Sequence, residues 1–180
     1  NVNRKNLIFI FNICNFLKIN LKKIIPTLNK FKGLRFRNEI VINGKKIKVI
    51  NDSKSTSFSS TQELIDTKKK TFWILGGLPK KGDKFTLSKK DCFNLRAYIF
   101  GKNAEFFVKR LKDKVHYQKF NNMISAIKKI KIDFKKEQMS NEKIILFSPA
   151  SASFDDFKNF EERGRYFNSQ LRKIGIYRKK

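Results

Sequence analysis

Apolar residues recur at helical spacing along the first part of the chain. Residues 3–17 follow this spacing, and residues 19–31 repeat it with Pro26 inside the pattern. Proline is tolerated in the first turn of a helix, where its missing N–H would have no intrahelical partner. The pattern therefore predicts a pair of helices, with Pro26 acceptable in a first turn.

A β-hairpin is predicted next. Residues 39–42 and 47–50 alternate around Asn43-Gly44. An Asn-Gly pair between two alternating runs is a strong hairpin signal. A new domain is therefore expected to begin near Lys32.

Strands and helices then alternate toward the C-terminus. Apolar runs predict strands at residues 71–75, 95–100, 115–118 and 143–147, and helical spacing predicts helices at 59–69, 104–111, 121–130 and 155–171. This alternation is typical of an α/β fold, a Rossmann-like, mainly parallel sheet with helices on both faces. Ligands of such sheets bind at the carboxyl ends of the strands. Unusual polar residues follow predicted strands at 52–56, 76–81 and 148–153. We therefore expect the segments 52–56, 76–80 and 148–160 to converge at one rim of the sheet and form a single anion-accepting cleft.

The charge of the chain leaves two classes of function open. A net charge of +27 is what a basic nucleic-acid-binding α/β module would carry. The lysines occur in every segment, however, and the heavy use of Lys, Asn, Ile and Phe matches an A+T-rich genome, which favours a solvated surface. Steeply salt-dependent binding of DNA or RNA would support the alternative.

Several other classes are disfavoured. Cys14 and Cys92 lie far apart without metal-ligand spacing, so neither a disulfide framework nor a zinc site is expected. The apolar run at residues 7–17 is shorter than the roughly 20 residues of a membrane span. His116 is the single histidine and lies on a weak strand, which favours a surface or packing role over catalysis. Most of the 19 phenylalanines lie beside Ile and Leu, as core residues do.

The loop at residues 51–56, NDSKST, could bind an anion. It combines a cation and hydroxyl groups ahead of a predicted helix, where backbone N–H groups point outward. The same residue types also form an ordinary helix cap with solvated charges. The composition of the loop alone leaves both interpretations open.

Longer motifs add a resemblance to a family. The sequence INDSKST at residues 50–56 and the sequence SPASASFD at 148–155, which continues as FKNFEERG at 157–164, resemble the C-terminal domain of the Mur ligases, especially of the members that add D-glutamate. The stretch WILGG at 73–77 with Lys80 is similar to the Gly-Gly loop of the family, and YIFG at 98–101 matches the strand and turn after it. The resemblance covers residues 1–175.

The resemblance implies two parts in the chain. Residues 1–32 would be the helical remnant of a central ATP-binding domain, and residues 33–180 would be the C-terminal, D-glutamate-binding domain of a longer enzyme. Val2 and Phe36 stand where many relatives have histidine. The connection near residues 32–37 would act as a gate when the last domain closes over the central one.

The resemblance also implies roles for individual residues. Lys54 and Lys80 would belong to the catalytic set, although Lys81 is an alternative to Lys80. The residues that would bind D-glutamate are Thr56, Lys80, Ser153, Phe154 and Phe160. The residues that would contact the nucleotide are Asn3, Asn6, Arg37, Asp52 and Lys54.

The implied activity is an ATP-dependent ligase of peptidoglycan synthesis. ATP would phosphorylate the carboxylate of UDP-N-acetylmuramoyl-L-alanine, and the amine of D-glutamate would attack the acyl phosphate. Mg²⁺ would be held mainly by the central domain, because the chain contains no G-x-x-x-x-G-K-[ST] phosphate loop. We expect a cytoplasmic monomer with no membrane or nucleic-acid partner, inactive without the N-terminal and central domains. A degenerate, purely structural domain is a third option, and the intact Lys54, Thr56, Lys80 and Ser153 disfavour it.

Overall fold

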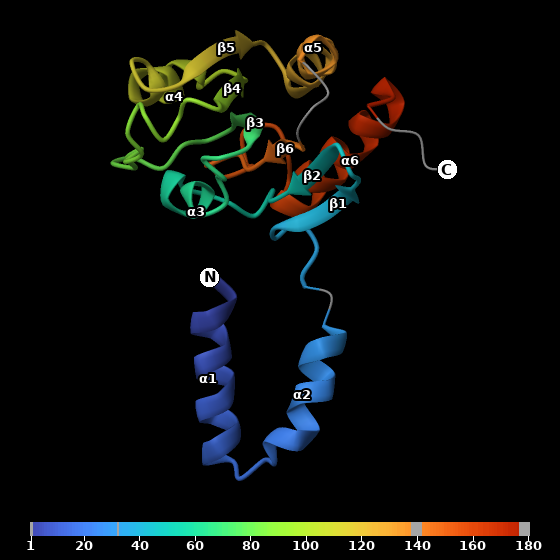
Figure 1. The fold of residues 1–180 in the computed structure, drawn as a ribbon. Coiled ribbons are helices and arrows are strands. Elements are labelled where there is room, and N and C mark those ends of the chain that lie inside the picture. The colour runs from blue at the N-terminus through green and yellow to red at the C-terminus, as the bar shows by residue number, and fades with distance from the viewer. Residues whose placement is uncertain (1, 32, 138–141, 177–180) are drawn as a thin grey trace. The chain divides into compact units, whose positions relative to one another are not determined.

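The computed structural model describes residues 2–31, 33–137 and 142–176. The chain divides into two units, Asn1–Gly33 and Leu34–Lys180. The first unit is a pair of helices, and the second is an α/β domain (Figure 1).

The helical unit consists of α1 (Val2–Phe16) and α2 (Leu21–Lys30). The side chain of Asn20 caps α2 by accepting a hydrogen bond from the Lys22 N–H at 2.9 Å. Because this cap begins the helix at Leu21, Pro26 lies inside α2 and beyond its first turn, so the condition under which the proline was acceptable is not met. Both predicted helices are confirmed. None of the described helices combines the length and apolar content needed to cross a membrane.

The α/β unit is built on one six-stranded sheet with the order β1-β2-β6-β3-β4-β5. The strands are β1 (Glu39–Asn43), β2 (Ile47–Asn51), β3 (Lys70–Gly76), β4 (Leu95–Phe100), β5 (His116–Phe120) and β6 (Lys143–Phe147). β1 pairs antiparallel with β2, and all other pairs are parallel. The predicted α/β fold with its N-terminal hairpin is confirmed.

Side chains of the buried strands alternate between the two faces of the sheet, as the pleat requires. Trp73 and Leu75 of β3 enter one core cluster, and Phe72 and Ile74 enter the other. All four side chains have no solvent exposure. A strand that is buried on both faces reads as a continuous apolar run, which explains the sequence pattern of β3.

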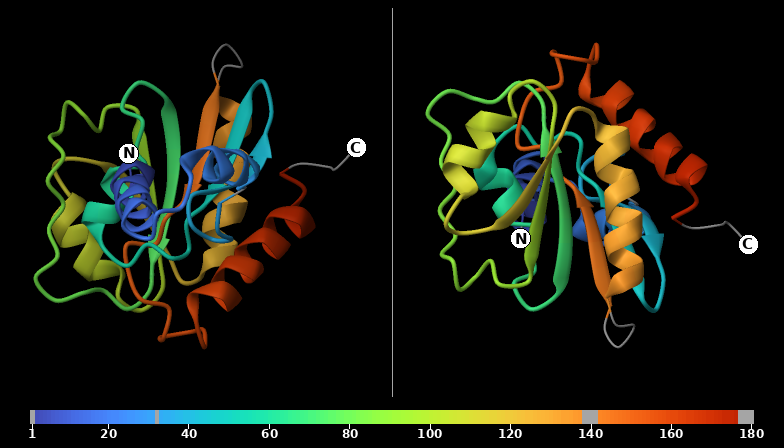
Figure 2. Two further views of the ribbon diagram at one scale, coloured as in Figure 1. Left: turned by 90° about the horizontal axis from the view of Figure 1, so that it is seen from below. Right: turned by 90° about the horizontal axis from the view of Figure 1, so that it is seen from above.

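Helices cover both faces (Figure 2). α3 (Phe58–Gln62) and α4 (Ala104–Leu111) pack on the Trp73 face, and α5 (Met123–Lys136) and α6 (Phe160–Ile174) pack on the Phe72 face. Phe147 of β6 stacks on Phe167 of α6 with ring centroids 4.3 Å apart. This contact anchors α6 against the strand that carries the last polar loop.

Three of the predicted helix boundaries are wrong. The helix expected at residues 59–69 ends at Gln62, and Leu64 and Ile65 pack against the core from turns instead. The helix expected from residue 155 begins at Phe160, because Asn159 caps it by accepting from the Glu162 N–H at 2.8 Å. The helix expected to end at residue 130 continues to Lys136.

Candidate functional site

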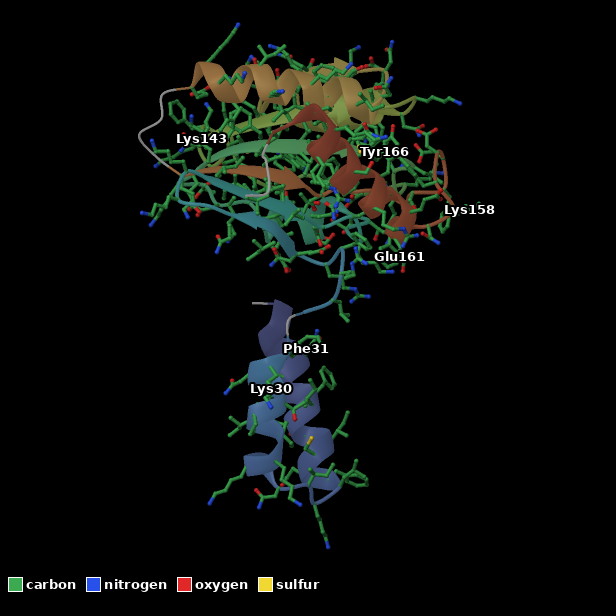
Figure 3. All side chains as sticks on the ribbon, turned by 90° about the vertical axis from the view of Figure 1, so that its right-hand side faces the viewer. Lys30, Phe31, Lys143, Lys158, Glu161 and Tyr166 are labelled. Carbon is green, nitrogen blue, oxygen red and sulfur yellow. The ribbon has the colours of Figure 1, made fainter. Side chains whose placement is uncertain are left out.

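Three loops leave the sheet at one edge. They follow β2, β6 and β3, which are parallel neighbours, so their carboxyl ends meet. Lys143, at the beginning of β6, lies at one end of the domain, and Lys158 and Glu161, which follow the loop after β6, lie at the other (Figure 3). The predicted convergence of residues 52–56, 76–80 and 148–160 depends on this strand order.

The loop after β2 is hydrogen-bonded to the loop after β6. The Asp52 N–H donates to the Phe147 carbonyl at 2.7 Å, and the Ser148 hydroxyl donates to the Asp52 carboxylate at 2.9 Å. The Ser151 N–H donates to the Ser55 carbonyl at 3.3 Å. Backbone and side-chain bonds thus hold the two loops in one arrangement.

The loop after β3 joins the same arrangement. The Ser151 hydroxyl donates to the Gly76 carbonyl at 2.8 Å, and Leu78 and Ala152 form an isolated β-bridge. Gly77 has φ +129°, and a Cβ there would lie 2.5 Å from the Ser151 oxygen. Glycine is therefore required for this close approach of the two loops.

The beginning of α6 closes the group of loops. The Ser53 hydroxyl donates to the Phe160 carbonyl at 2.8 Å. The ammonium nitrogen of Lys54 lies 4.1 Å from the centroid of the Phe160 ring. This cation–π contact orients a half-buried lysine at the edge where the three loops meet.

Asp52 has a buried carboxylate whose oxygens can accept further hydrogen bonds. Burial raises its pKa, whereas the bonds from the Asn38 N–H and the Ser148 hydroxyl and the charge of Arg37 oppose that rise. Each carboxylate oxygen accepts one of these hydrogen bonds and has a further lone pair. Asp52 is therefore suited to accept a hydroxyl group of a ligand.

The predicted site residues differ in exposure. Thr56, Lys80 and Lys81 are exposed, and Phe154 is 72% exposed. Ser153 is buried, with 3% exposure. The three loops meet as predicted, so the exposed hydroxyl and ammonium groups belong to loops at one edge of the sheet.

Two of the residues predicted to contact the nucleotide, Asn3 and Asn6, belong to the helical unit. Asn6 is exposed on α1. The side chain of Asn3 lies outside the described part of the structure. Both residues belong to the first unit, whereas Asp52 and Arg37 belong to the second.

Two groups of residues at the site were not predicted from the sequence. A chain of hydroxyls joins Ser148, Thr61 and Ser55, each step being 2.8 Å long. Arg163 of α6 is 1% exposed and donates hydrogen bonds to the loops after β2 and β6. A signal for Arg163 was present, because it lies four residues before Phe167 on the apolar face of its helix.

Other reactive groups of the described residues lie elsewhere. No group of three or more His, Cys, Asp or Glu that could hold a metal ion occurs in the described part of the chain. His116 is exposed on β5. Burial raises the pKa of Cys92 to about 11, so its thiol is protonated at neutral pH.

Comparison with known proteins identifies the relatives of the chain. No protein-family model matches it. The chain is 35% identical over 173 residues to the UDP-N-acetylmuramoylalanine–D-glutamate ligase of Wolbachia sp. subsp. Brugia malayi, an alignment that covers 96% of this chain and 34% of the ligase. It is 33% identical over 176 residues to the ligase of the same name from Francisella philomiragia, covering 96% of this chain and 41% of that protein. The chain thus spans 34% to 41% of the length of these relatives.

The fold comparison agrees with the sequence comparison. The structure of a pseudomurein peptide ligase type C from Methanothermus fervidus matches 89% of this chain and 33% of its own chain, with a TM-score of 0.53 and 15% sequence identity. At that identity the match shows a shared fold. The chain belongs to the Mur ligase family and corresponds to the C-terminal part of its D-glutamate ligases.

Proposed function

We propose that this chain is the C-terminal part of the ATP-dependent ligase that adds D-glutamate to UDP-N-acetylmuramoyl-L-alanine in peptidoglycan synthesis. The observation that carries the proposal is the convergence of the loops after β2, β3 and β6, because these loops contain the motifs of the resemblance. The names of the relatives, which cover 96% of the chain, support the choice of substrate. We place the ligase in the cytoplasm as a monomer.

D-glutamate recognition is assigned to the rim where the three loops meet. The amino acid carries two carboxylates, which call for a cation and several hydrogen-bond donors. Lys80 would contribute the charge, and the hydroxyls of Thr56 and Ser153 would donate. Phe154 of the loop after β6 and Phe160 at the beginning of α6 would line the aliphatic part of the ligand.

Nucleotide recognition is assigned to Asp52 and Arg37, together with Asn3 and Asn6 of the helical unit. The free lone pairs of the Asp52 carboxylate fit ribose hydroxyls, and Arg37 is exposed close enough to influence the pKa of Asp52. ATP, when bound, supplies the phosphoryl group that activates the acceptor carboxylate. Mg²⁺ would be held by the upstream part of the enzyme. The chain matches 34% and 41% of the two relatives, so more than half of their length lies outside the match.

The contribution of this chain to the reaction would be positioning. The D-glutamate amine must point at the activated carbonyl, and water must be kept away from it. Lys54, oriented by the Phe160 ring at 4.1 Å, would neutralise charge where the nucleotide and the amino acid approach each other. The connection at residues 32–37 would let the domain close over the upstream part and open for release.

A titration of the chain with D-glutamate tests the binding role. Amide NMR signals of residues 52–56, 78, 80, 81 and 151–154 should shift with D-glutamate and remain in place with L-glutamate. Lys80→Gln should weaken the response, and Lys81→Gln is its matched control because both lysines are exposed. The reverse order of effects would assign the role to Lys81, and no response in these loops would contradict the proposal.

A chimera tests the activity. The C-terminal part of the Francisella philomiragia ligase would be replaced by this chain, and ADP release would be measured with UDP-N-acetylmuramoyl-L-alanine and D-glutamate. We expect D-glutamate-dependent release from the chimera and none from the chain alone. Release that does not depend on D-glutamate would argue against this substrate.

A further inference from the structure

Arg163 is a buried cation at the point where the site loops meet. It lies near the beginning of α6, between the labelled residues Glu161 and Tyr166 (Figure 3). Its side chain is 1% exposed and shares the inward face of the helix with Phe167 and Leu171. An arginine at an apolar-face position is unusual unless it has hydrogen-bond partners.

The guanidinium group bridges two of the loops. Nη2 donates to the Ser53 carbonyl at 2.7 Å and to the Ser151 carbonyl at 2.9 Å, and Nη1 donates to the Ala152 carbonyl at 2.9 Å. Nε and Nη1 also reach the hydroxyls of Ser53 and Ser151, at 3.2 and 3.5 Å. One planar group thus bonds to the loop after β2 and to the loop after β6.

The third loop is attached through the same residues. Ser151 donates its hydroxyl to the Gly76 carbonyl, and Ala152 exchanges backbone hydrogen bonds with Leu78 at 2.9 and 3.0 Å. Nη1 of Arg163 would lie 3.0 Å from a Cβ at Gly77. The guanidinium is therefore packed directly beneath the Gly-Gly turn of the loop after β3.

The chemistry of the side chain explains why arginine is suited to this position. Burial lowers the pKa of Arg163 to about 10, so the group is still charged at neutral pH. Its fork offers five donors in a fixed plane, whereas the ammonium of lysine is a compact point charge. The acceptors in these five contacts are carbonyls and hydroxyls, so the contacts orient the loops without neutralising the charge.

We propose that Arg163 is a positioning residue for D-glutamate binding, a clamp that sets the three loops in the arrangement the ligand requires. The naming of D-glutamate rests on the proposed function. The clamp acts through the Ser53 peptide, which precedes Lys54, and through Ala152, which precedes Ser153. The charged guanidinium also lies beneath the loops that would receive D-glutamate, which carries two carboxylates.

The test compares Arg163→Lys with Arg165→Lys, an exposed arginine on the same helix. Amide hydrogen exchange of the whole chain and D-glutamate affinity are measured for both variants. In Arg163→Lys the amides of Leu78, Ser151 and Ala152 should exchange at least about tenfold faster, while those of β4 keep their rates. D-glutamate affinity should fall by about tenfold, since charge is kept and only geometry is lost. Arg165→Lys should change neither quantity.

Other outcomes are equally informative. Unchanged amide exchange in the loops would contradict the clamp. Equally faster amide exchange in β4 would also contradict it, because that result indicates a general loss of stability. If Arg163→Lys does not fold, Ser151→Ala tests the clamp instead. In this variant the Leu78 amide should exchange faster while the amides of β4 keep their rates. An unaltered exchange rate at Leu78 would contradict the coupling to the third loop. If the wild-type chain does not respond to D-glutamate, the proposed function fails while the exchange data still decide the clamp.

Discussion

Replacing Gly76 with alanine would place a Cβ against the neighbouring strand. That atom would lie 2.2 Å from the Phe100 carbonyl oxygen and 3.0 Å from the carbonyl carbon. Phe100 belongs to β4, which is paired on both sides with β3 and β5, so its backbone cannot easily move away. Gly76 also has φ +148°, a conformation that side chains with a Cβ rarely adopt.

The expected loss of stability is the sum of these two effects. A residue held in a sparsely populated backbone region costs about 1–3 kcal/mol. Overpacking against a rigid neighbour costs about 1–3 kcal/mol more. Gly101→Ala is the matched control, because Gly101 has φ +88° but nothing within 4 Å of an added Cβ. Gly76→Ala should therefore exceed Gly101→Ala by about 1–3 kcal/mol.

Urea unfolding measures the difference. Trp73 is the single tryptophan, is fully buried in β3 and reports on the sheet by its fluorescence. Linear extrapolation of the three unfolding curves yields the two losses of stability relative to wild type. Equal losses for Gly76→Ala and Gly101→Ala would refute the steric reasoning, because only the backbone effect is common to both.

Three further substitutions test other parts of the structure. Asp52→Asn removes a buried carboxyl whose pKa is raised by burial. The protonated Asp52 carboxyl stabilises the fold fully below its ordinary pKa of 3.8, and this stabilisation is lost as pH rises through the raised pKa of the folded state. At neutral pH the variant should therefore have a higher melting temperature than wild type. In acid this difference in melting temperature should disappear. Phe160→Leu should remove about 0.5–1 kcal/mol of coupling to Lys54, measured in a double-mutant cycle with Lys54→Met; zero coupling would contradict the cation–π contact. Phe167→Ala should lower the free energy of unfolding by about 3–5 kcal/mol in urea, and a loss below about 1 kcal/mol would show that the Phe147 stack is not a core contact.

Local sequence patterns predicted most elements of the α/β unit because their causes are local. The strand at residues 143–147 and the helix at residues 104–111 have the predicted bounds, since continuous apolar runs and helical spacing are read within a few residues. Helix ends were predicted less well. Leu64 and Ile65 have helical spacing after α3 but reach the core from turns.

The candidate site was predicted in part. The segments 52–56, 76–80 and 148–160 were expected to converge, because polar segments after parallel strands share an edge. The clamp by Arg163 and the hydroxyl chain through Thr61 were not expected. Their partners lie 110 and 87 residues away in the sequence, at Ser53 and Ser148. No local pattern encodes a hydrogen bond of that separation.

By itself the sequence determined the α/β class, the hairpin, the loop motifs and the family, because each depends on residue type and spacing over short stretches. Tertiary structure alone decided that β6 lies between β2 and β3, and therefore which loops touch. It also decided that Arg163 is buried while Lys80 is exposed. Strand order and burial follow from covering both faces of the whole sheet, a condition that involves every element at once.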